Sequence, residues 1–97
     1  MKRLAFLFIA LATVLVANAA VVTGQVTDAQ GEPLIGVSVV QTGTSNGTIT
    51  DFDGFYNIDV ANDAQLQFSY IGYVTVTENI NNRTTINVVL REDTRVL

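Results

Sequence analysis

The sequence predicts an all-β fold, a seven-stranded antiparallel β-sandwich, from three observations. Short runs rich in Val, Ile and Thr alternate apolar and polar residues with a period of two, which is typical of half-buried strands. All seven glycines fall between positions 24 and 72, and most of them separate these runs. No helical periodicity follows position 21. Because glycine reaches positive φ freely, its regular placement indicates turns that join successive antiparallel hairpins.

The first twenty residues have the three parts of a secretory signal, and we expect residues 1–20 to be a helical signal peptide. A Lys-Arg start precedes an apolar stretch at 4–16, and residues 17–19 read Ala-Asn-Ala, the small-x-small form of a cleavage site. A membrane anchor is the alternative. The apolar run is shorter than the ~20 residues that a spanning helix needs, and strand-like alternation starts at Val22. We therefore expect an exported chain whose mature part has no transmembrane segment.

Charge and composition exclude several classes of function. Without the signal peptide the chain has three arginines against nine acidic residues, a net charge of −6, and no lysine. Nucleic-acid binding and attraction to anionic lipid head groups both need clustered positive charge, so neither is expected. The mature part also has no His, Cys or Trp, which removes thiol and imidazole catalysis and nearly every zinc site. We expect a protein that is not an enzyme, has no cofactor and folds without disulfides.

One domain is expected over residues 21–92, followed by a short C-terminal tail at 93–97. The predicted strands cover residues 22–27, 37–42, 48–51, 56–60, 66–70, 74–77 and 86–90. The residues assigned to turns between them are Gly31, Pro33, Gly36, Asn46, Gly47, Asp53, Gly54 and Gly72.

Two of these turns carry a more specific prediction. Asn46-Gly47 is predicted to form a type I′ hairpin turn, because that turn needs positive φ at both central positions. Gly72 is predicted to lie at a bend or bulge where the chain moves between sheets. The charged residues from 91 onward are expected to fray.

Asp51 and Asp53 are the candidate metal ligands. Alternating acids before a glycine resemble part of a calcium loop, where oxygen atoms converge on a hard cation. A complete loop needs a third ligand beyond the glycine and a distal Glu, and neither is present. The competing interpretation, which we favour, is a turn whose Asp side chains bond their own backbone. A hydrolase built on the two acids would also need a cleft, which short loops do not offer.

The aromatic residues point mainly to a core. Phe68 and Tyr70 alternate with polar residues on the same strand face as Leu66, which favours burial. Tyr73 lies beyond Gly72 and is expected near the surface. Tyr73 and Phe55 are therefore the candidates for a sugar-stacking surface.

The motifs follow one another almost without a gap. They read Val-x-Gly-x-Val-x-Asp at 22–28, Gly-Glu-Pro-Leu-Ile-Gly-Val at 31–37, Gly-Thr at 43–44, Gly-Thr-Ile-Thr-Asp at 47–51, Asp-Gly-Phe-Tyr at 53–56 and Phe-Ser-Tyr-Ile-Gly-Tyr at 68–73. This order resembles the carboxypeptidase-D regulatory-like domain. The last phrase is especially similar to the N-terminal extension of SusC/RagA-type TonB-dependent outer-membrane transporters of Gram-negative bacteria.

The resemblance implies a transthyretin-like (prealbumin-like, Ig-like) sandwich that is exported, non-catalytic and located on the periplasmic side of a nutrient transporter. The implied partners are outer-membrane transporter components or another periplasmic protein. Members of the family continue into a TonB box, a plug and a barrel, whereas this sequence stops at Leu97. We therefore expect a truncated or stand-alone accessory domain. The alternative is a stand-alone carbohydrate-binding β-sandwich module.

Overall fold

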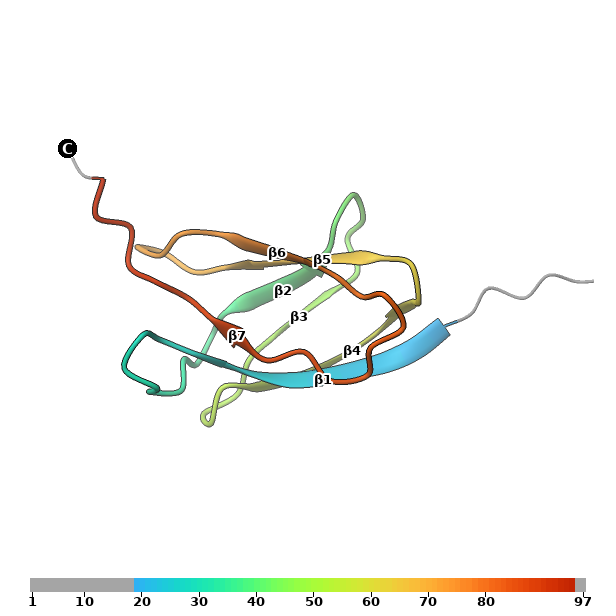
Figure 1. The fold of residues 1–97 in the computed structure, drawn as a ribbon, viewed down its shortest axis with the longest axis horizontal. Coiled ribbons are helices and arrows are strands. Elements are labelled where there is room, and N and C mark those ends of the chain that lie inside the picture. Colours follow the sequence, from blue (N-terminus) through green and yellow to red (C-terminus); the bar gives the residue numbers. More distant parts are fainter. Residues whose placement is uncertain (1–18, 96–97) are drawn as a thin grey trace, which may run out of the picture.

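A computed structural model describes residues 19–95 and shows two packed β-sheets (Figure 1). Its strands are β1 (Ala19–Thr27), β2 (Ser38–Gln41), β3 (Gly47–Ile49), β4 (Phe55–Ala61), β5 (Gln65–Ser69), β6 (Val76–Asn79) and β7 (Val88–Val89). None of the described residues is helical, so none forms a helix that could cross a membrane. The predicted all-β sandwich class is confirmed.

The predicted signal peptide lies almost wholly outside the described residues. Only its last two positions, Ala19 and Ala20, are described, and both belong to β1, where they pair with Ala61 and Val60 of β4. The boundary between signal peptide and domain stays a prediction.

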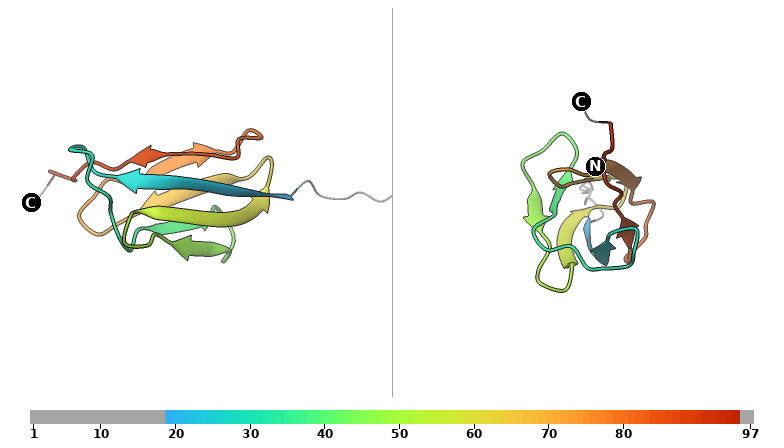
Figure 2. Two further views of the ribbon diagram at one scale, coloured as in Figure 1. Left: turned by 90° about the horizontal axis from the view of Figure 1, so that it is seen from below. Right: turned by 90° about the vertical axis from the view of Figure 1, so that its left-hand side faces the viewer.

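The strands divide into a three-stranded sheet, ordered β4-β1-β7, and a four-stranded sheet, ordered β3-β2-β5-β6. The two sheets lie face to face (Figure 2). Neighbouring strands are antiparallel except β1 and β7, which run parallel at Val26↔Val88 and Thr27↔Val89. The chain leaves β6 in one sheet and enters the other sheet beside β1, in the same direction as β1.

The expected succession of hairpins is therefore only partly right. Two connections, β2–β3 and β5–β6, join neighbours within a sheet, while the others cross from one sheet to the other. Turn-forming residues indicate that the chain reverses direction, but they do not indicate which sheet the next strand joins.

The core lies between the sheets and follows the predicted alternation. In β5, Leu66 and Phe68 are fully buried while Gln67 is exposed. Phe68 meets Tyr56 of β4 edge to face, with ring centroids 5.4 Å apart. The buried cluster consists of Val22, Val26, Leu34, Val37, Val39, Tyr56, Ile58, Val60, Leu66, Phe68, Ile80, Ile86, Val88 and Leu90.

Gly24 occupies a core-facing position between Val22 and Val26 and has a packing role. A Cβ atom at Gly24 would lie 1.9 Å from the carbonyl oxygen of Ile86 and 2.9 Å from the ring of Tyr56. The Tyr56 ring packs against Gly24 instead, and its hydroxyl donates a hydrogen bond of 2.6 Å to the same carbonyl. Burial, and secondarily the charge of Glu78, raises the pKa of Tyr56 to about 12.

The connections gather at two ends of the sandwich (Figures 1 and 2). One end, which we call the tail end, holds the loop after β1, the 51–54 turn, the 70–73 turn and residues 91–95. The opposite end holds the start of β1 and the β2–β3 and β4–β5 connections. Motif residues that are distant in the sequence therefore meet at the tail end.

Candidate functional site

The two candidate metal ligands lie in one turn at the tail end. The Asp51 carboxylate accepts hydrogen bonds of 2.9 Å from the backbone N–H groups of Asp53 and Phe55. The Gly54 N–H donates to the Asp51 carbonyl at 2.9 Å. Among residues 19–95, no three His, Cys, Asp or Glu side chains gather where they could hold a metal ion. Asp51 thus has the backbone-capping geometry of a turn.

Gly54 ties this turn to the loop after β1. Its φ is 78°, and a Cβ there would lie 2.5 Å from the Val26 carbonyl oxygen. The Val26 N–H donates to Gly54 O at 2.8 Å, and Val26 O accepts from the Leu34 N–H at 3.0 Å. This close approach excludes a side chain, so Gly54 is needed both for its φ and for its size. Since β3 and β4 belong to different sheets, the turn joins the two layers.

Thr50 is a structural residue that the sequence interpretation missed. Only 2% of it is exposed. Its hydroxyl donates to Leu34 O at 2.6 Å and accepts from the Val37 N–H at 2.9 Å, and its backbone bonds to Gly36 and Val37. The neighbouring Ile49 instead faces solvent. Hydropathy alone would bury Ile49 and expose Thr50. The structure has the opposite arrangement because the buried Thr50 hydroxyl satisfies backbone groups of the 34–37 loop.

The type I′ turn predicted at Asn46-Gly47 is wrong. Neither residue has positive φ; Gly43 does, at 82°, and Gly47 belongs to β3. The β2–β3 loop is longer than two residues and closes with Gln41 N–H donating to Asn46 O at 2.9 Å. The Asn46 side chain donates to the Asp59 carbonyl of β4, also at 2.9 Å. Asn46 therefore links an edge of one sheet to an edge of the other.

The geometry expected of that turn occurs at a different place. Asn81 and Asn82 have φ of 50° and 65°, and the Arg83 N–H donates to Ile80 O at 2.9 Å. Positive φ at both central positions is the mark of a type I′ turn. Asparagine tolerates this conformation better than other non-glycine residues.

The loop after β1 contains three further predicted turn residues. Gly31 and Gly36 have φ of 86° and 83°, and Pro33 forms an isolated antiparallel bridge with Thr27. The Asp28 carboxylate accepts from the N–H groups of Gln30 and Glu32, at 2.9 Å each. This segment joins β1 to β2, and the Asp28 side chain holds its backbone.

Gly72, with φ of 88°, lies in the turn that joins β5 and β6. The Tyr73 N–H donates to Tyr70 O at 3.0 Å across this turn. Both strands belong to the four-stranded sheet, so the prediction that the chain changes sheets at Gly72 is wrong. Positive φ is what the turn requires, and the strand after it can join either sheet.

The two candidate stacking aromatics have different environments. Phe55 is 51% exposed and lines a shallow pocket of about 300 Å³ together with Thr23 and Asn57. Tyr73 is partly buried against the core, with its ring centroid 5.4 Å from that of Tyr70. Phe55 therefore offers a more accessible ring than Tyr73.

The chain does not fray from position 91 as predicted. The Val74 N–H donates to Arg91 O at 2.9 Å, and the Asp93 N–H donates to Gly72 O at 2.8 Å. Tyr73 and Glu92 form an antiparallel bridge between these two bonds. Sequence alone offers no signal for this pairing, because it depends on β7 delivering the chain beside the 70–73 turn.

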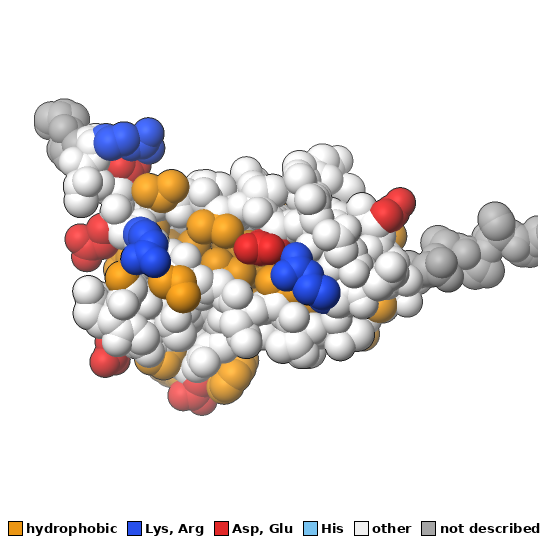
Figure 3. Space-filling view, in the orientation of Figure 1, with side chains coloured by type: hydrophobic (Ala, Val, Ile, Leu, Met, Phe, Trp, Pro, Cys, Tyr) orange, Lys and Arg blue, Asp and Glu red, His pale blue; other side chains and the backbone are white. Residues whose placement is uncertain are grey.

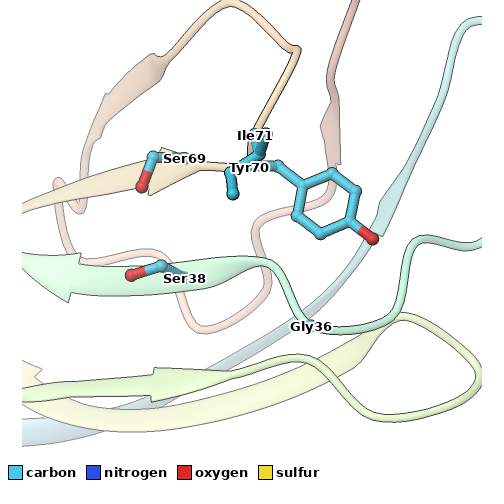
Figure 4. Close-up of a pocket in the computed structure, with 5 residues that line it drawn as sticks. All are labelled: Gly36, Ser38, Ser69, Tyr70 and Ile71. Carbon is cyan, nitrogen blue, oxygen red and sulfur yellow. The ribbon is translucent and has the colours of Figure 1, made fainter.

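An open groove of about 600 Å³ lies on the outer face of the four-stranded sheet (Figure 4). Ser38 and Ser69, which are paired across β2 and β5, line it with their hydroxyls side by side. The Tyr70 ring reaches over Gly36, and Ile71 stands beside it. The groove holds no ionisable group that could serve as an acid, base or nucleophile at neutral pH.

Two solved structures share the fold at low sequence identity. A type II cohesin–X-dockerin complex from Acetivibrio cellulolyticus contains a chain with a TM-score of 0.58 and 19% identity, covering 73% of this chain and 56% of that one. The 3-chlorocatechol 1,2-dioxygenase of Rhodococcus opacus has a TM-score of 0.58 and 12% identity, covering 80% and 61%. At these identities the similarity shows a shared fold and nothing about function.

Curated relatives are much more similar in sequence. A TonB-dependent receptor of Formosa agariphila is 43% identical over 77 residues, which cover 78% of this chain and 7% of that protein. The TonB-dependent receptor SusC of Bacteroides thetaiotaomicron is 41% identical over 76 residues, with the same two coverages. The chain thus spans about 7% of the length of these relatives. Residues 22–97 match the CarboxypepD_reg-like domain, and the chain belongs to that family.

Proposed function

We propose that this chain is a non-catalytic interaction domain of the Gram-negative periplasm, working with an outer-membrane transporter of the TonB-dependent class. One observation carries the non-catalytic part. The motif side chains most able to do chemistry are engaged in holding backbone: Asp51 caps Phe55, Thr50 holds the 34–37 loop, and Asn46 bonds β4. The motif therefore builds a scaffold.

The location and the partner class rest on two further supports. The predicted signal peptide directs export, and the similarity to TonB-dependent receptors favours the outer membrane as the site of action. An acidic domain without lysine suits protein contacts better than contacts with nucleic acid or anionic lipid.

Immunoprecipitation from the envelope of the native bacterium tests this proposal. Antibodies against the folded domain should recover it from the periplasmic or outer-membrane fraction, together with a TonB-dependent transporter or as part of one. N-terminal sequencing should find a mature end near position 20. Recovery from the cytoplasm with an uncleaved N-terminus would overturn the proposal. So would a hydrolytic activity that disappears in the Asp51→Asn, Asp53→Asn double variant.

Carbohydrate binding is the second candidate, and the environment of Phe55 favours it. A half-exposed ring beside the Asn57 amide and the Thr23 hydroxyl offers stacking and hydrogen bonding on one face. Glycan-array binding that Phe55→Ala abolishes and Phe52→Ala preserves would establish this function, since Phe52 is an exposed aromatic in the adjacent turn. An array on which the domain binds no glycan would reject it.

A further inference from the structure

Asn46-Gly47 is the one Asn-Gly pair in the sequence, and its chemistry goes beyond the structural link that Asn46 makes. The backbone nitrogen of the residue after an asparagine can attack the Cγ atom of the asparagine side chain and close a five-membered ring. A following glycine favours this attack, because it has no side chain in the way and its backbone rotates most freely. Asparagine is accordingly one of the thermolabile residue types. The pair is therefore a candidate site of spontaneous modification.

The attacking atom would be the Gly47 nitrogen, which faces the open edge of β3. The Gln41 N–H donates to Asn46 O at 2.9 Å, so these two residues form a hydrogen-bonded pair of the antiparallel ladder. Hydrogen-bonded and non-hydrogen-bonded pairs alternate along such a ladder, so the next pair, Val40 and Gly47, exchanges no bonds. Since β3 is the outermost strand of its sheet, the Gly47 N–H is not held by β2.

The atom under attack would be Asn46 Cγ, and two hydrogen bonds fix the side chain that carries it. The Asn46 amide nitrogen donates to the Asp59 carbonyl of β4 at 2.9 Å and to the side-chain oxygen of Gln41 at 3.1 Å. Both bonds hold the nitrogen that would leave as ammonia. Ring closure turns Cγ towards the Gly47 nitrogen and away from β4. The two bonds therefore oppose the reaction in the folded domain.

The loop that carries Asn46 can open while the sandwich stays folded. Residues 42–46 are all exposed, and none of them belongs to the core cluster. In Figure 1 the loop between β2 and β3 projects beyond the sheets, and its tip is white in Figure 3, the colour of uncharged polar side chains and backbone. Segments with few buried contacts open at a lower free energy than the whole domain. Release of Asn46 therefore needs only local opening.

We propose that Asn46 is a deamidation site whose rate is controlled by its bonds to Asp59 and Gln41. When the loop opens, the Gly47 nitrogen forms a bond to Asn46 Cγ. The bond from Cγ to the amide nitrogen breaks, and ammonia leaves with the proton that the Gly47 nitrogen has lost. Water then opens the resulting succinimide at either carbonyl and leaves aspartate or isoaspartate at position 46. One water is consumed, one ammonia is released and nothing is oxidised or reduced.

Either product breaks the link that Asn46 makes between the two sheets. An ionised carboxylate has no N–H to donate, so it meets the Asp59 carbonyl with oxygen against oxygen. Isoaspartate also places its Cβ atom in the main chain just before β3, which disturbs the register of that strand. The change is irreversible and frees the Asp59 carbonyl at the open edge of β4. This inference does not depend on the proposed function.

Other positions suit the same reaction less well. Asp53 is also followed by a glycine, but Gly54 is buried and its N–H donates to the Asp51 carbonyl at 2.9 Å. Asn81 and Asn82 lie in a turn, but the residues that follow them carry side chains that obstruct the attacking nitrogen. Asn46 should therefore react first.

Peptide mapping by mass spectrometry of the purified exported protein tests the site and its control. Samples are incubated at mildly alkaline pH, in buffer and in urea that unfolds the domain. Asn46 should be the first residue to deamidate in both. The folded domain should react at least about tenfold more slowly, which corresponds to an opening free energy of about 1.4 kcal/mol. Equal rates in buffer and urea, or faster conversion of another asparagine, would overturn the proposal.

Two variants distinguish local opening from unfolding of the whole domain. Gln41→Ala removes one of the two acceptors and should speed deamidation of the folded domain about fivefold, which corresponds to losing about 1 kcal/mol. Tyr56→Phe removes the buried bond to Ile86 and lowers the stability of the whole domain, but it should leave the rate at Asn46 unchanged. Acceleration by Tyr56→Phe without acceleration by Gln41→Ala would show that the two bonds do not control the site.

A second pair of variants tests the structural consequence. Asn46→Asp reproduces one product and should unfold at a lower urea concentration than wild type, because the bond to Asp59 is lost. Asn57→Asp adds the same charge at an exposed position of β4 and should unfold with wild type. Identical midpoints for the two variants would mean that the bond to Asp59 holds nothing in place, which contradicts the proposal.

Discussion

At the scale of single residues, the glycines of this chain serve two different needs. Gly31, Gly43 and Gly72 have positive φ and open space around them, so only their backbone conformation requires glycine. Gly24 has ordinary backbone geometry but no room for a side chain. Gly54 meets both conditions. The sequence shows glycine at each of these positions, but the physical reason that requires glycine differs among them.

Gly24→Ala should be strongly destabilising. The new methyl group would overlap the Ile86 carbonyl and the Tyr56 ring, and backbone atoms cannot swing aside as a flexible side chain does. Overpacking of this kind costs about 1–3 kcal/mol or more, and we expect the upper part of that range. Urea unfolding measures the loss. The control is Gly31→Ala, which has open space and should cost only the strain of positive φ, about 1 kcal/mol; the reverse order would refute the packing role of Gly24.

Position 51 should tolerate asparagine, which keeps a side-chain oxygen, but replacement by alanine should lower the stability of the domain. Asp51→Asn keeps an acceptor for the N–H groups of Asp53 and Phe55 and should change the free energy of unfolding by less than about 0.5 kcal/mol. Asp51→Ala leaves both donors without this partner and should cost about 1–2 kcal/mol. Neither calcium nor a chelator should move the melting temperature of wild type. A calcium-dependent rise that Asp51→Asn abolishes would instead establish a metal site.

At the scale of elements, residues of two turns bond the open edge of β4 near its two ends. Its pairing with β1 turns the N–H and C=O groups of Phe55 and Asp59 toward the open edge. Asp51 bonds both groups of Phe55, and Asn46 bonds the Asp59 carbonyl. Occupied edge groups resist the addition of another strand. The turn motifs therefore reverse the chain and also occupy backbone groups on the open edge of β4 that another strand could otherwise bind.

The C-terminal residues act as a further short pairing element, and one backbone donor tests it. Asp93→Pro removes the N–H that bonds Gly72 and should loosen residues 91–93 from the β5–β6 turn. Faster hydrogen exchange of the Val74 amide, which donates to Arg91, should reveal this. Asp93→Ala is the control, since it loses the pair with Arg95 but keeps the N–H. Equal exchange rates in the two variants would argue against the pairing.

At the scale of the whole molecule, two separate groups of buried hydrogen bonds brace the sandwich. The Tyr56 hydroxyl, carried by β4, reaches past Gly24 of β1 to the Ile86 carbonyl, just before β7, and so ties together the strands of the three-stranded sheet. At the tail end, the buried Thr50 hydroxyl joins the end of β3 to the 34–37 loop that precedes β2, its neighbour in the four-stranded sheet. Without any cysteine, these buried polar contacts and the apolar core hold the sandwich together.

The loss of stability at alkaline pH should depend on the buried Tyr56 hydroxyl. Tyr56 keeps its proton to about pH 12 in the folded domain, whereas an unfolded tyrosine titrates near 10. Its contribution to the free energy of unfolding is therefore complete below pH 10 and is lost as the pH rises from 10 to 12. Urea unfolding of Tyr56→Phe should show a lower stability at neutral pH and a shallower alkaline decline than wild type. Parallel profiles would show that Tyr56 does not set the decline.

The sequence by itself determined the strand class, the number of strands and the inward face of each long strand. Those properties depend on local periodicity, as in β5, where Leu66 and Phe68 alternate with polar neighbours. It also identified the family, because the motif residues are needed for local turns and close contacts. It failed at Asn46-Gly47, where a longer loop with Gly43 competes with the two-residue turn.

Only the tertiary structure decided which sheet each strand joins, the parallel pairing of β1 with β7, and the pairing of residues 91–93 with the β5–β6 turn. It also placed Asp28, Tyr73 and Glu92 around one recess at the tail end. These features join residues about twenty to more than sixty positions apart. The local sequence indicates the backbone conformation of a segment and which of its side chains are buried. These long-range pairings form only when the two sheets close over a shared core, so no local pattern predicts them.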